Sequence, residues 1–429
     1  MNKYERYKKV DLPWLEEVPE HWEVKRNKSI FKEKKEVVGE RFIDYKLLSL
    51  TLRGVIERNL DGGGKFPASF EKYVVVKSND FVFCLFDMDE TPRTIGLSLR
   101  EGMITGAYTI FEAYTNYSSQ FLNYFYLYID SIKGLKPYYS GLRKTVNMDK
   151  FNSIKIPIPP LDEQEKIAAF LDWKINEIDR LIAVEKEKIE KLNRLFEKII
   201  SFNSSNMQEE SIRKYVDIVR GNSTFTKDDL LSKGTYVALQ YGKVYKVDTI
   251  DNNYNFYVND EFYKSSQIVD RNDIIAVYTS ETIEDLGHFA FYDRDEKGLI
   301  GGEQLLIKPK EGIDPKYLFY CLKKDALSLK KASTGIKVYR FKSNDLKSIK
   351  IPVVSLNEQK KIVERIEKKL SIIKRNINIC NSIIGELNSF KYSLISEVVT
   401  GKIDVRNVVI PSYEKVDIDI STDEEKIKE

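Results

Sequence analysis

A near-repeat at a spacing of 195 residues constrains this chain more than any other feature. Residues 154–167 (IKIPIPPLDEQEKI) and 349–362 (IKIPVVSLNEQKKI) are identical at nine of fourteen positions, where chance composition gives about one match. The same register continues without a gap to residues 199–201 and 394–396. Duplication of part of the chain explains this agreement, and it predicts a fold with internal pseudo-two-fold symmetry.

Each copy of the repeat predicts an extended segment followed by a long helix. Prolines at positions 157, 159, 160 and 352 keep the chain extended ahead of each helix. Asp162 and Asn357 are the expected N-cap residues. We therefore expect helical segments at residues 156–205 and 351–403, each with about 40 helical residues and a length of about 60 Å.

Apolar residues in both helices recur in alternating steps of four and three, which is typical of a coiled-coil seam. Seven of the nine positions are apolar in both copies, and Glu185 and Lys391 are the exceptions. Each seam could pack on its own globular domain, but the length of the helices favours antiparallel pairing with each other. The expected seam consists of Leu171, Ile175, Ile178, Ile182, Glu185, Ile189, Leu192, Phe196 and Ile199, with Ile366, Leu370, Ile373, Ile377, Cys380, Ile384, Leu387, Lys391 and Leu394.

Two globular heads are expected at residues 1–155 and 206–350, because these regions carry short β-prone runs and one helical run each. The β-prone runs are KYVVV, DFVFCLF and AYTIFEAY in the first head and TYVALQYG, DIIAVYT and EQLLIKP in the second. The heads match poorly outside these landmarks. The expected fold class is therefore α+β, with two mixed α/β domains separated by two long antiparallel helices that form a coiled coil.

Composition narrows the class of protein. The 429 residues exceed one ordinary domain, and no apolar run of membrane-spanning length occurs. Three scattered cysteines favour a reducing, cytoplasmic setting. The formal net charge is +3, but residues 412–429 contain seven acids and three lysines, which leaves a body of net charge +7. The body is compatible with nucleic-acid binding, and residues 404–429 are expected to form an acidic, disordered tail.

The sequence lacks the residues of common active sites. Only two histidines occur, His21 and His288, one in each head, so a His-based triad or His/Cys metal cluster is not expected. Neither a GxxxxGK[ST] loop nor a GxGxxG fingerprint is present. We therefore expect no catalytic residue, no metal ligand and no cofactor in this chain.

Loops rich in basic, aromatic and small residues occur in both heads and are candidates for DNA binding, because Arg and Lys can contact phosphates and guanine edges. For any one of these residues an ordinary solvated loop is nearly as good an explanation, and their recurrence in both heads favours DNA. The candidates are Arg53, Arg58, Lys65, Arg93, Tyr138, Arg143 and Lys144 in the first head, and Tyr241, Lys243, Lys246, Lys331, Lys337, Tyr339 and Arg340 in the second.

Three motifs together resemble the specificity subunit of type I restriction-modification systems. They are the doubled phrase IPIPPLDEQEKI and IPVVSLNEQKKI, the ending LISEVVTGKIDV (394–405) and the opening DLPWLEEVPEHWEVKRNKSIF (11–31). The resemblance reaches to about residue 406. This sequence departs from the pattern in two places, because PPLDEQ becomes VSLNEQ and the first helix lacks a VTGKI-like ending.

The resemblance implies a non-catalytic subunit whose two target-recognition domains each read half of a split sequence in double-stranded DNA. The helices would set the spacer and bind two methyltransferase subunits, and Glu163, Gln164, Glu358 and Gln359 are the candidate docking residues. S-adenosylmethionine, ATP and Mg²⁺ would belong to the methyltransferase and restriction (translocase) partners. Two alternatives are a coiled-coil scaffold whose heads bind proteins or sugars, and a self-contained nuclease or methyltransferase, which would need a cofactor loop.

Overall fold

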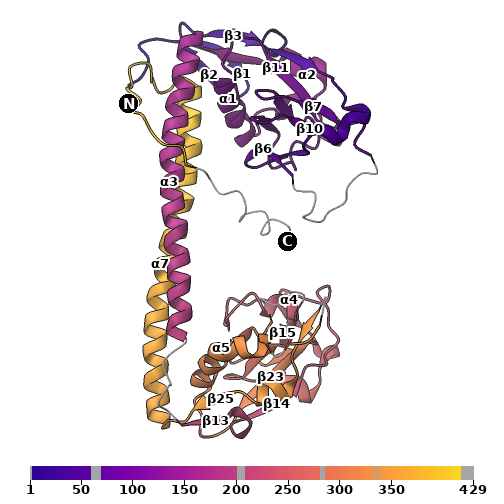
Figure 1. The fold of residues 1–429 in the computed structure, drawn as a ribbon, viewed down its shortest axis with the longest axis vertical. Helices are drawn as coiled ribbons and strands as arrows, with labels where there is room; N and C mark the ends of the chain where they lie inside the picture. Colours follow the sequence, from indigo (N-terminus) through magenta and orange to yellow (C-terminus); the bar gives the residue numbers. More distant parts are fainter. Residues whose placement is uncertain are drawn as a thin grey trace. The chain divides into compact units, whose positions relative to one another are not determined.

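The computed structural model describes residues 2–58, 69–200, 208–280, 286–331, 333–335 and 338–416. The chain divides into two compact units (Figure 1). Unit 1 comprises Met1–Lys186 with Asn381–Glu429, and unit 2 comprises Glu187–Cys380. The division crosses both long helices, so each head shares a core with part of each helix. The prediction from sequence instead treats the heads and the helices as separate segments of the chain.

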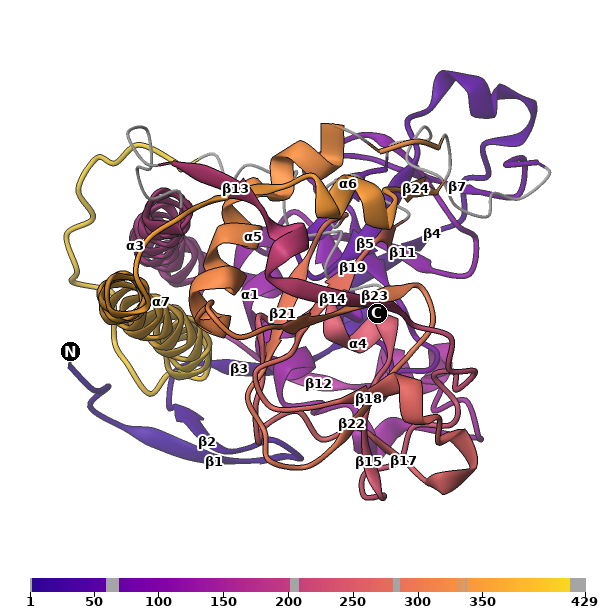
Figure 2. The same ribbon diagram turned by 90° about the horizontal axis from the view of Figure 1, so that it is seen from below.

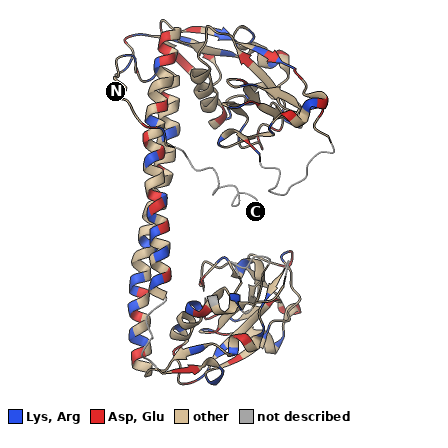
Figure 3. Ribbon diagram, in the orientation of Figure 1, with Lys and Arg blue, Asp and Glu red and all other residues tan. Residues whose placement is uncertain are grey.

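The two long helices are α3 (Leu161–Ile200) and α7 (Leu356–Val399). They pair in antiparallel fashion in each unit, since the start of α3 shares a core with the end of α7 in unit 1, and the reverse holds in unit 2. Figures 1 and 2 show the two helices side by side. All eighteen expected seam positions are buried or half-buried, which confirms the seam. Acidic and basic residues are interspersed along both helices (Figure 3). Among the described residues, no helix has an apolar stretch long enough to cross a membrane.

Both long helices begin earlier than the N-cap prediction placed them. The first helical hydrogen bond of α3 runs from the Gln164 amide to the Pro160 carbonyl at 2.9 Å, and that of α7 from the Gln359 amide to the Ser355 carbonyl at 2.9 Å. The Ser355 Oγ also accepts a hydrogen bond from the Glu358 amide at 3.3 Å. The prediction of Asp162 and Asn357 as N-caps was therefore wrong by two residues, because proline is well tolerated at the start of α3 and the Ser355 hydroxyl caps α7.

The head of unit 1 is built on a four-stranded antiparallel sheet of order β4-β11-β8-β9. Helix α1 (Ser119–Ser131) packs on this sheet through a row of aromatic side chains, and its N-cap is Ser118. Smaller pairs are β1-β2, β3-β12, β5-β6 and β7-β10. The strands are β1 (Tyr7–Leu12), β2 (Leu15–Pro19), β3 (Glu23–Arg26), β4 (Phe31–Lys34), β5 (Leu48–Thr51), β6 (Gly54–Glu57), β7 (Val74–Val76), β8 (Phe81–Phe83), β9 (Ile95–Leu97), β10 (Gly102–Ile104), β11 (Thr109–Ala113) and β12 (Lys155–Ile158).

The head of unit 2 has a five-stranded sheet of order β14-β23-β19-β21-β16 and a four-stranded sheet of order β17-β15-β22-β18. Short pairs β13-β25 and β20-β24 complete it. The helices are α4 (Tyr241–Val244), α5 (Pro315–Lys331) and α6 (Ser343–Lys347). The strands are β13 (Glu209–Ser211), β14 (Val216–Arg220), β15 (Tyr236–Leu239), β16 (Thr249–Ile250), β17 (Tyr257–Val258), β18 (Ile268–Val269), β19 (Ile274–Val277), β20 (Thr279–Ser280), β21 (Phe289–Tyr292), β22 (Gly298–Ile300), β23 (Gln304–Pro309), β24 (Tyr339–Arg340) and β25 (Lys350–Pro352).

The two heads share the strand order of their central sheet. Strands β4-β11-β8-β9 of unit 1 correspond in order and direction to β14-β23-β19-β21 of unit 2, and the pair β3-β12 corresponds to β13-β25. The residue just before β8 and before β19 is an aspartate that contacts a lysine of a different strand in each head: Asp80 contacts Lys34 of β4, and Asp273 contacts Lys308 of β23. Helices α1 and α5, and then α2 (Met148–Ser153) and α6, follow in the same order. The expected mixed α/β heads are confirmed, and duplication therefore extends beyond the long helices.

Residues 404–416 continue from α7 and pack on unit 1. Val405 is fully buried, and the Asp404 amide donates to the Asn2 carbonyl at 2.9 Å. The Asn176 side chain of α3 holds the chain near Val416 by hydrogen bonds of 2.8 and 3.0 Å. These contacts differ from the expectation of a disordered tail that begins at residue 404, since apolar residues among the acids find a core to join. Residues 417–429 lie outside the described part of the chain.

Candidate nucleic-acid interface and the contacts between helices and heads

Residues 140–145 of unit 1 form a tight hairpin, here called the tip hairpin. Ser140 and Thr145 form an antiparallel bridge with backbone hydrogen bonds of 2.9 and 3.0 Å, and their hydroxyl groups donate to each other's carbonyl oxygens. Gly141 and Lys144 have φ values of 67° and 44°, which lie in the left-handed region that tight turns require. The predicted residues Arg143 and Lys144 are exposed on this hairpin.

Asp87 fixes the tip hairpin to the segment that follows β8. Its carboxylate accepts hydrogen bonds from Arg143 Nε at 3.1 Å and from Arg143 Nη2 at 2.5 Å, and its amide donates to the Arg143 carbonyl at 2.7 Å. The Arg143 guanidinium also lies 5.1 Å from the centre of the Phe86 ring. Hydrogen bonding to Arg143 lowers the pKa of Asp87. Arg143 is therefore a brace of the hairpin, and Lys144 is the cation at its tip.

Unit 2 contains a hairpin at the corresponding place. Thr334 and Arg340 form its antiparallel bridge, and Ser280 pairs with Tyr339. The predicted residue Arg340 lies 3.3 Å from the carboxylate of Glu303, and Lys331 is exposed at the end of α5. Lys337, predicted in the same loop, lies outside the described residues. The structure thus places Tyr339 and Arg340 together on β24, and Arg340, like Arg143, contacts a carboxylate.

Arg93 joins a turn of the head to the end of α1. Its Nη2 donates to the Leu52 carbonyl at 2.9 Å, beside the β5–β6 turn that carries Arg53, and its Nη1 lies 3.9 Å from Asp130. Arg53 is exposed in that turn, and Arg58 is exposed just after β6. The Arg93 side chain is only 12% exposed. Arg93 therefore positions this turn, and Arg53 and Arg58 are better placed to contact a ligand.

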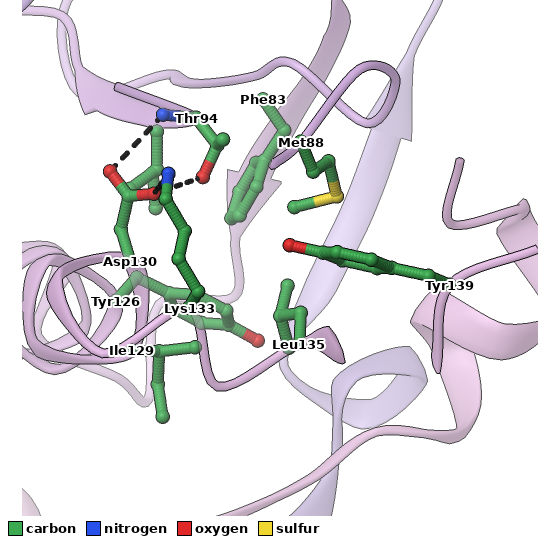
Figure 4. A pocket seen from close by; sticks show the side chains of 10 residues that line it. Phe83, Met88, Thr94, Tyr126, Ile129, Asp130, Lys133, Leu135 and Tyr139 are labelled. Atoms are coloured by element: carbon green, nitrogen blue, oxygen red, sulfur yellow. Dashed lines mark hydrogen bonds and ion pairs between the residues drawn. The ribbon is translucent and has the colours of Figure 1, made fainter. Parts of the chain in front are cut away.

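Asp130 is the buried acceptor on which this region depends (Figure 4). It accepts hydrogen bonds from the Thr94 amide at 3.1 Å and hydroxyl at 2.7 Å, and from Lys133 Nζ at 3.2 Å. A cavity of about 10 Å³ lies beside it, next to Tyr139, and this volume is at the lower limit for one water molecule. Burial raises the pKa of Tyr139 to about 12. This arrangement is structural, and the cavity is too small for a cofactor.

The two remaining DNA-binding candidates of the first head are Tyr138 and Lys65. Tyr138 is half-buried, and its ring centre lies 6.3 Å from that of Trp14, so it packs the β1–β2 hairpin against the head. Lys65 lies outside the described residues. Tyr138 is therefore a packing residue in this structure.

Three predicted residues of the second head lie on and just after the short helix α4. The rings of Tyr241 and Tyr245 are 5.8 Å apart. Lys243 Nζ lies 4.9 Å from the centre of the Phe256 ring, and Lys246 Nζ lies 5.6 Å from that of Tyr245. Cations held over aromatic faces form a surface on which bases could stack.

Glu163, one of the predicted docking residues, is buried in unit 1 with 4% exposure. Its carboxylate accepts hydrogen bonds from the Tyr4 hydroxyl at 2.6 Å and the Trp22 indole at 2.9 Å, and its second oxygen lies 2.7 Å from His21 Nε2. Burial and the neighbouring Glu163 carboxylate raise the pKa of Tyr4. Glu163 thus attaches the N-terminal segment to the first turn of α3.

Gln164 and Gln359 make the same contact in the two units. The Gln164 side chain accepts from the Ser118 amide at 2.9 Å and donates to the Pro159 carbonyl at 2.8 Å. The Gln359 side chain accepts from the Asp314 amide at 2.7 Å and donates to the Val354 carbonyl at 3.0 Å. Ser118 and Asp314 are the residues that start α1 and α5. Each glutamine therefore connects its long helix to the head helix.

These contacts explain why three of the four predicted docking residues are buried, and their part in docking stays a prediction. Gln164 and Gln359 are 1% and 5% exposed, so neither they nor Glu163 presents a surface to a partner in this structure. Glu358 differs, because its side chain is 43% exposed beside Lys361. Sequence reasoning did not identify Tyr4, Trp22 or Asp87. The one sequence signal for any of them was the segment PEHW (19–22) in the opening motif, which contains Trp22.

A duplicated head on a duplicated helix defines a protein with two related domains. A family model described as the type I restriction modification DNA specificity domain matches residues 101–194 and 205–383. This match covers more than half of the chain, which therefore belongs to the type I restriction-modification DNA specificity family and has a role in DNA recognition. Among the described residues, no group of three or more His, Cys, Asp or Glu side chains is arranged to hold a metal ion.

Individual relatives agree with the family assignment. The chain is 26% identical over 425 residues to the type I restriction enzyme MjaVIII specificity subunit of Methanocaldococcus jannaschii, which covers 91% of this chain and 95% of the relative. It is 28% identical over 285 residues to the putative MjaX specificity subunit of the same organism, where the match spans 63% of the relative, less than two thirds. A solved structure concerned with assembly and conformational transition of the type I R-M system has the same fold, with a TM-score of 0.66, 13% identity, and coverage of 90% of this chain and 99% of the other.

Proposed function

We propose that this chain is the non-catalytic DNA-binding subunit of a type I restriction-modification complex, and that each head reads one half of a bipartite target. The observation that carries this proposal is the shared topology of two heads whose exposed side chains differ. One backbone arrangement with two different surfaces suits the reading of two different short sequences. Cations on the tip hairpin and on α4 are available to contact phosphates and bases.

The partners follow from the same proposal. Two methyltransferase subunits would bind the duplicated, charged outer faces of α3 and α7, and S-adenosylmethionine would enter with them. ATP and Mg²⁺ would act in the restriction subunits. The duplication supports two copies of one partner, because a repeated helix surface repeats its binding site. Of the predicted docking residues, Glu358 is the one whose exposure suits contact with a partner.

The two long helices would set the number of unread base pairs between the half-sites. A deletion of residues 182–188 together with residues 377–383 removes one heptad from each helix and leaves the apolar seam unbroken. Each helix then shortens by about 10 Å, close to the length of about three base pairs. Mapping of methylated adenines in host DNA, before and after this replacement in the chromosome, measures the target.

The expected result is a spacer about three base pairs shorter with both half-sites unchanged. A change in the half-sites would show that the helices belong to the reading surface, and an unchanged spacer would show that they do not set it. Removal of residues 182–188 alone is the control, and it should impair folding because the paired helices then differ in length. If the purified protein binds protein partners but no DNA at low salt, the scaffold alternative replaces this proposal.

A further inference from the structure

Leu142 is fully exposed at the end of the tip hairpin. Its relative exposure is 100%, higher than that of any other large hydrophobic side chain among the described residues; Val409 follows at 85% and Ile43 at 82%. Isolated exposed apolar residues are common on protein surfaces. Leu142 differs from them because the backbone that carries it is fixed.

The hairpin holds Leu142 in place without burying it. Four hydrogen bonds join Ser140 and Thr145, and Asp87 secures the next residue, Arg143, through both its side chain and its amide. Val146 continues the attachment through a 2.9 Å hydrogen bond to the Leu85 carbonyl. Folding therefore gains little from the leucine side chain itself. A fixed apolar side chain in water suits a surface that covers it on binding.

The sequence at the tip recurs in the second head. Ser140-Gly141-Leu142-Arg143 corresponds to Thr334-Gly335-Ile336-Lys337, so an aliphatic residue stands between a glycine and a cation in both. Gly335 has φ of 133°, and a Cβ there would lie 1.9 Å from the Val338 carbonyl oxygen, so this position requires glycine. The structure of Ile336 and Lys337 lies outside the described residues. Because the two heads are proposed to read different sequences, a feature common to both favours a role that does not depend on sequence.

We propose that Leu142 is a wedge that enters the first half-site between neighbouring base pairs and unstacks them. Leucine is one of the side chains that proteins insert between base steps from the minor groove, and such wedges kink the duplex. Lys144 would contact a backbone phosphate beside the wedge, because Arg143 is already held by Asp87. This inference rests on the proposed DNA-reading function.

The test uses Leu142→Ala in the full-length chain, purified with the methyltransferase subunits that it binds. Leu99→Ala is the matched control, since Leu99 is another exposed leucine of unit 1, at 69%. The probe is a duplex with the mapped target and 2-aminopurine at one position of the half-site at a time. The wild type and Leu99→Ala should each increase 2-aminopurine fluorescence at one step. Leu142→Ala should abolish this increase and weaken binding at least about five-fold, the lower end of what loss of a stacking side chain costs.

Two further duplexes separate the wedge from other contacts. An abasic site at the responsive step removes the stacking that the wedge must break, so Leu142→Ala should bind this duplex nearly as tightly as the wild type. A duplex with deoxyuridine for thymine lacks the thymine methyl group. If Leu142→Ala loses affinity only for the thymine duplex, Leu142 contacts a methyl group and the wedge is wrong. Unchanged affinity and fluorescence also overturn it, whereas failure of the wild type to bind any target refutes the proposed function instead.

Discussion

Lys391 of α7 donates hydrogen bonds of 2.7 and 2.9 Å to the two carboxylate oxygens of Asp179 of α3, so a charge pair joins residues 212 positions apart. Lys391 occupies a seam position that is apolar in the other copy of the repeat. Both side chains are shielded, with 25% and 15% exposure. A shielded charge pair in an apolar seam disfavours other registers, because any shift leaves both charges without a partner.

Lys391→Met should destabilise unit 1 by about 1 to 2 kcal/mol, because it leaves the Asp179 carboxylate half-buried and unpaired. Addition of Asp179→Leu should recover most of this loss, since an apolar pair suits the seam. Urea unfolding of the two single variants and the double variant measures the coupling. Additive losses would mean that the two residues do not act as a pair.

Glu163→Gln should lower the free energy of unfolding of unit 1 by about 2 kcal/mol, because a neutral amide replaces a buried carboxylate that accepts two hydrogen bonds from Tyr4 and Trp22. Glu358→Gln is the matched control at the duplicated position, and its exposed side chain should make the change nearly neutral. Thermal or urea unfolding compares them. Equal effects of the two variants would contradict the different roles assigned to the two glutamates.

Gln164→Ala and Gln359→Ala should each destabilise the protein by about 1 to 3 kcal/mol, because each leaves one half-buried amide and one carbonyl without a partner. Hydrogen exchange gives a local readout. The Ser118 amide should exchange faster only in Gln164→Ala, and the Asp314 amide only in Gln359→Ala. Faster exchange of both amides in either variant would show that the two contacts are not independent.

Asp404 should make the stability of unit 1 depend on pH. Hydrogen bonds from Arg406 lower the pKa of Asp404 below its ordinary value of 3.8. A carboxyl group with a lowered pKa in the folded state contributes stability above about pH 4, and this contribution is lost as pH falls through the folded-state pKa. Asp404→Asn should therefore be less stable than the wild type at pH 7, by about 1 kcal/mol. Urea unfolding from pH 7 to pH 3 should show this difference shrinking on the acid side, and a constant difference would contradict it.

Much of the fold was predictable because it depends on local patterns. The alternation of four and three placed all eighteen seam residues, including Lys391, and β-prone runs placed β8, β11, β19 and β23. The N-cap of α3 was misplaced by two residues because Pro160 offers its carbonyl but no polar side chain that a capping rule would recognise, whereas Ser355 of α7 has such a side chain and was passed over in favour of Asn357. The spacing of apolar residues in a sequence identifies the buried face of a helix. It does not identify the residue to which a polar side chain will bond.

The site was less predictable for that reason. A Glu-Gln pair in a first helical turn is typical of a solvated surface, and its burial here depends on residues far away in sequence, such as Tyr4 and Ser118. Arg143 was found from composition, but its role as a brace depends on Asp87, 56 positions earlier. Leu142 has no polar group that a sequence pattern could single out, and only its exposure in a fixed turn distinguishes it.

The contact made by Gln164 and Gln359 has a consequence for how such proteins could change. Each glutamine bonds to main-chain groups, an amide at the start of a head helix and a carbonyl just before its own helix. Every amino acid except proline can supply the amide. Recombination could therefore replace the gene segment that encodes one head with a segment from a related gene. The new head would form the same hydrogen bonds to the glutamine of the long helix without further mutation. New specificities would arise by the shuffling of whole heads, without any need for compensating substitutions at this attachment.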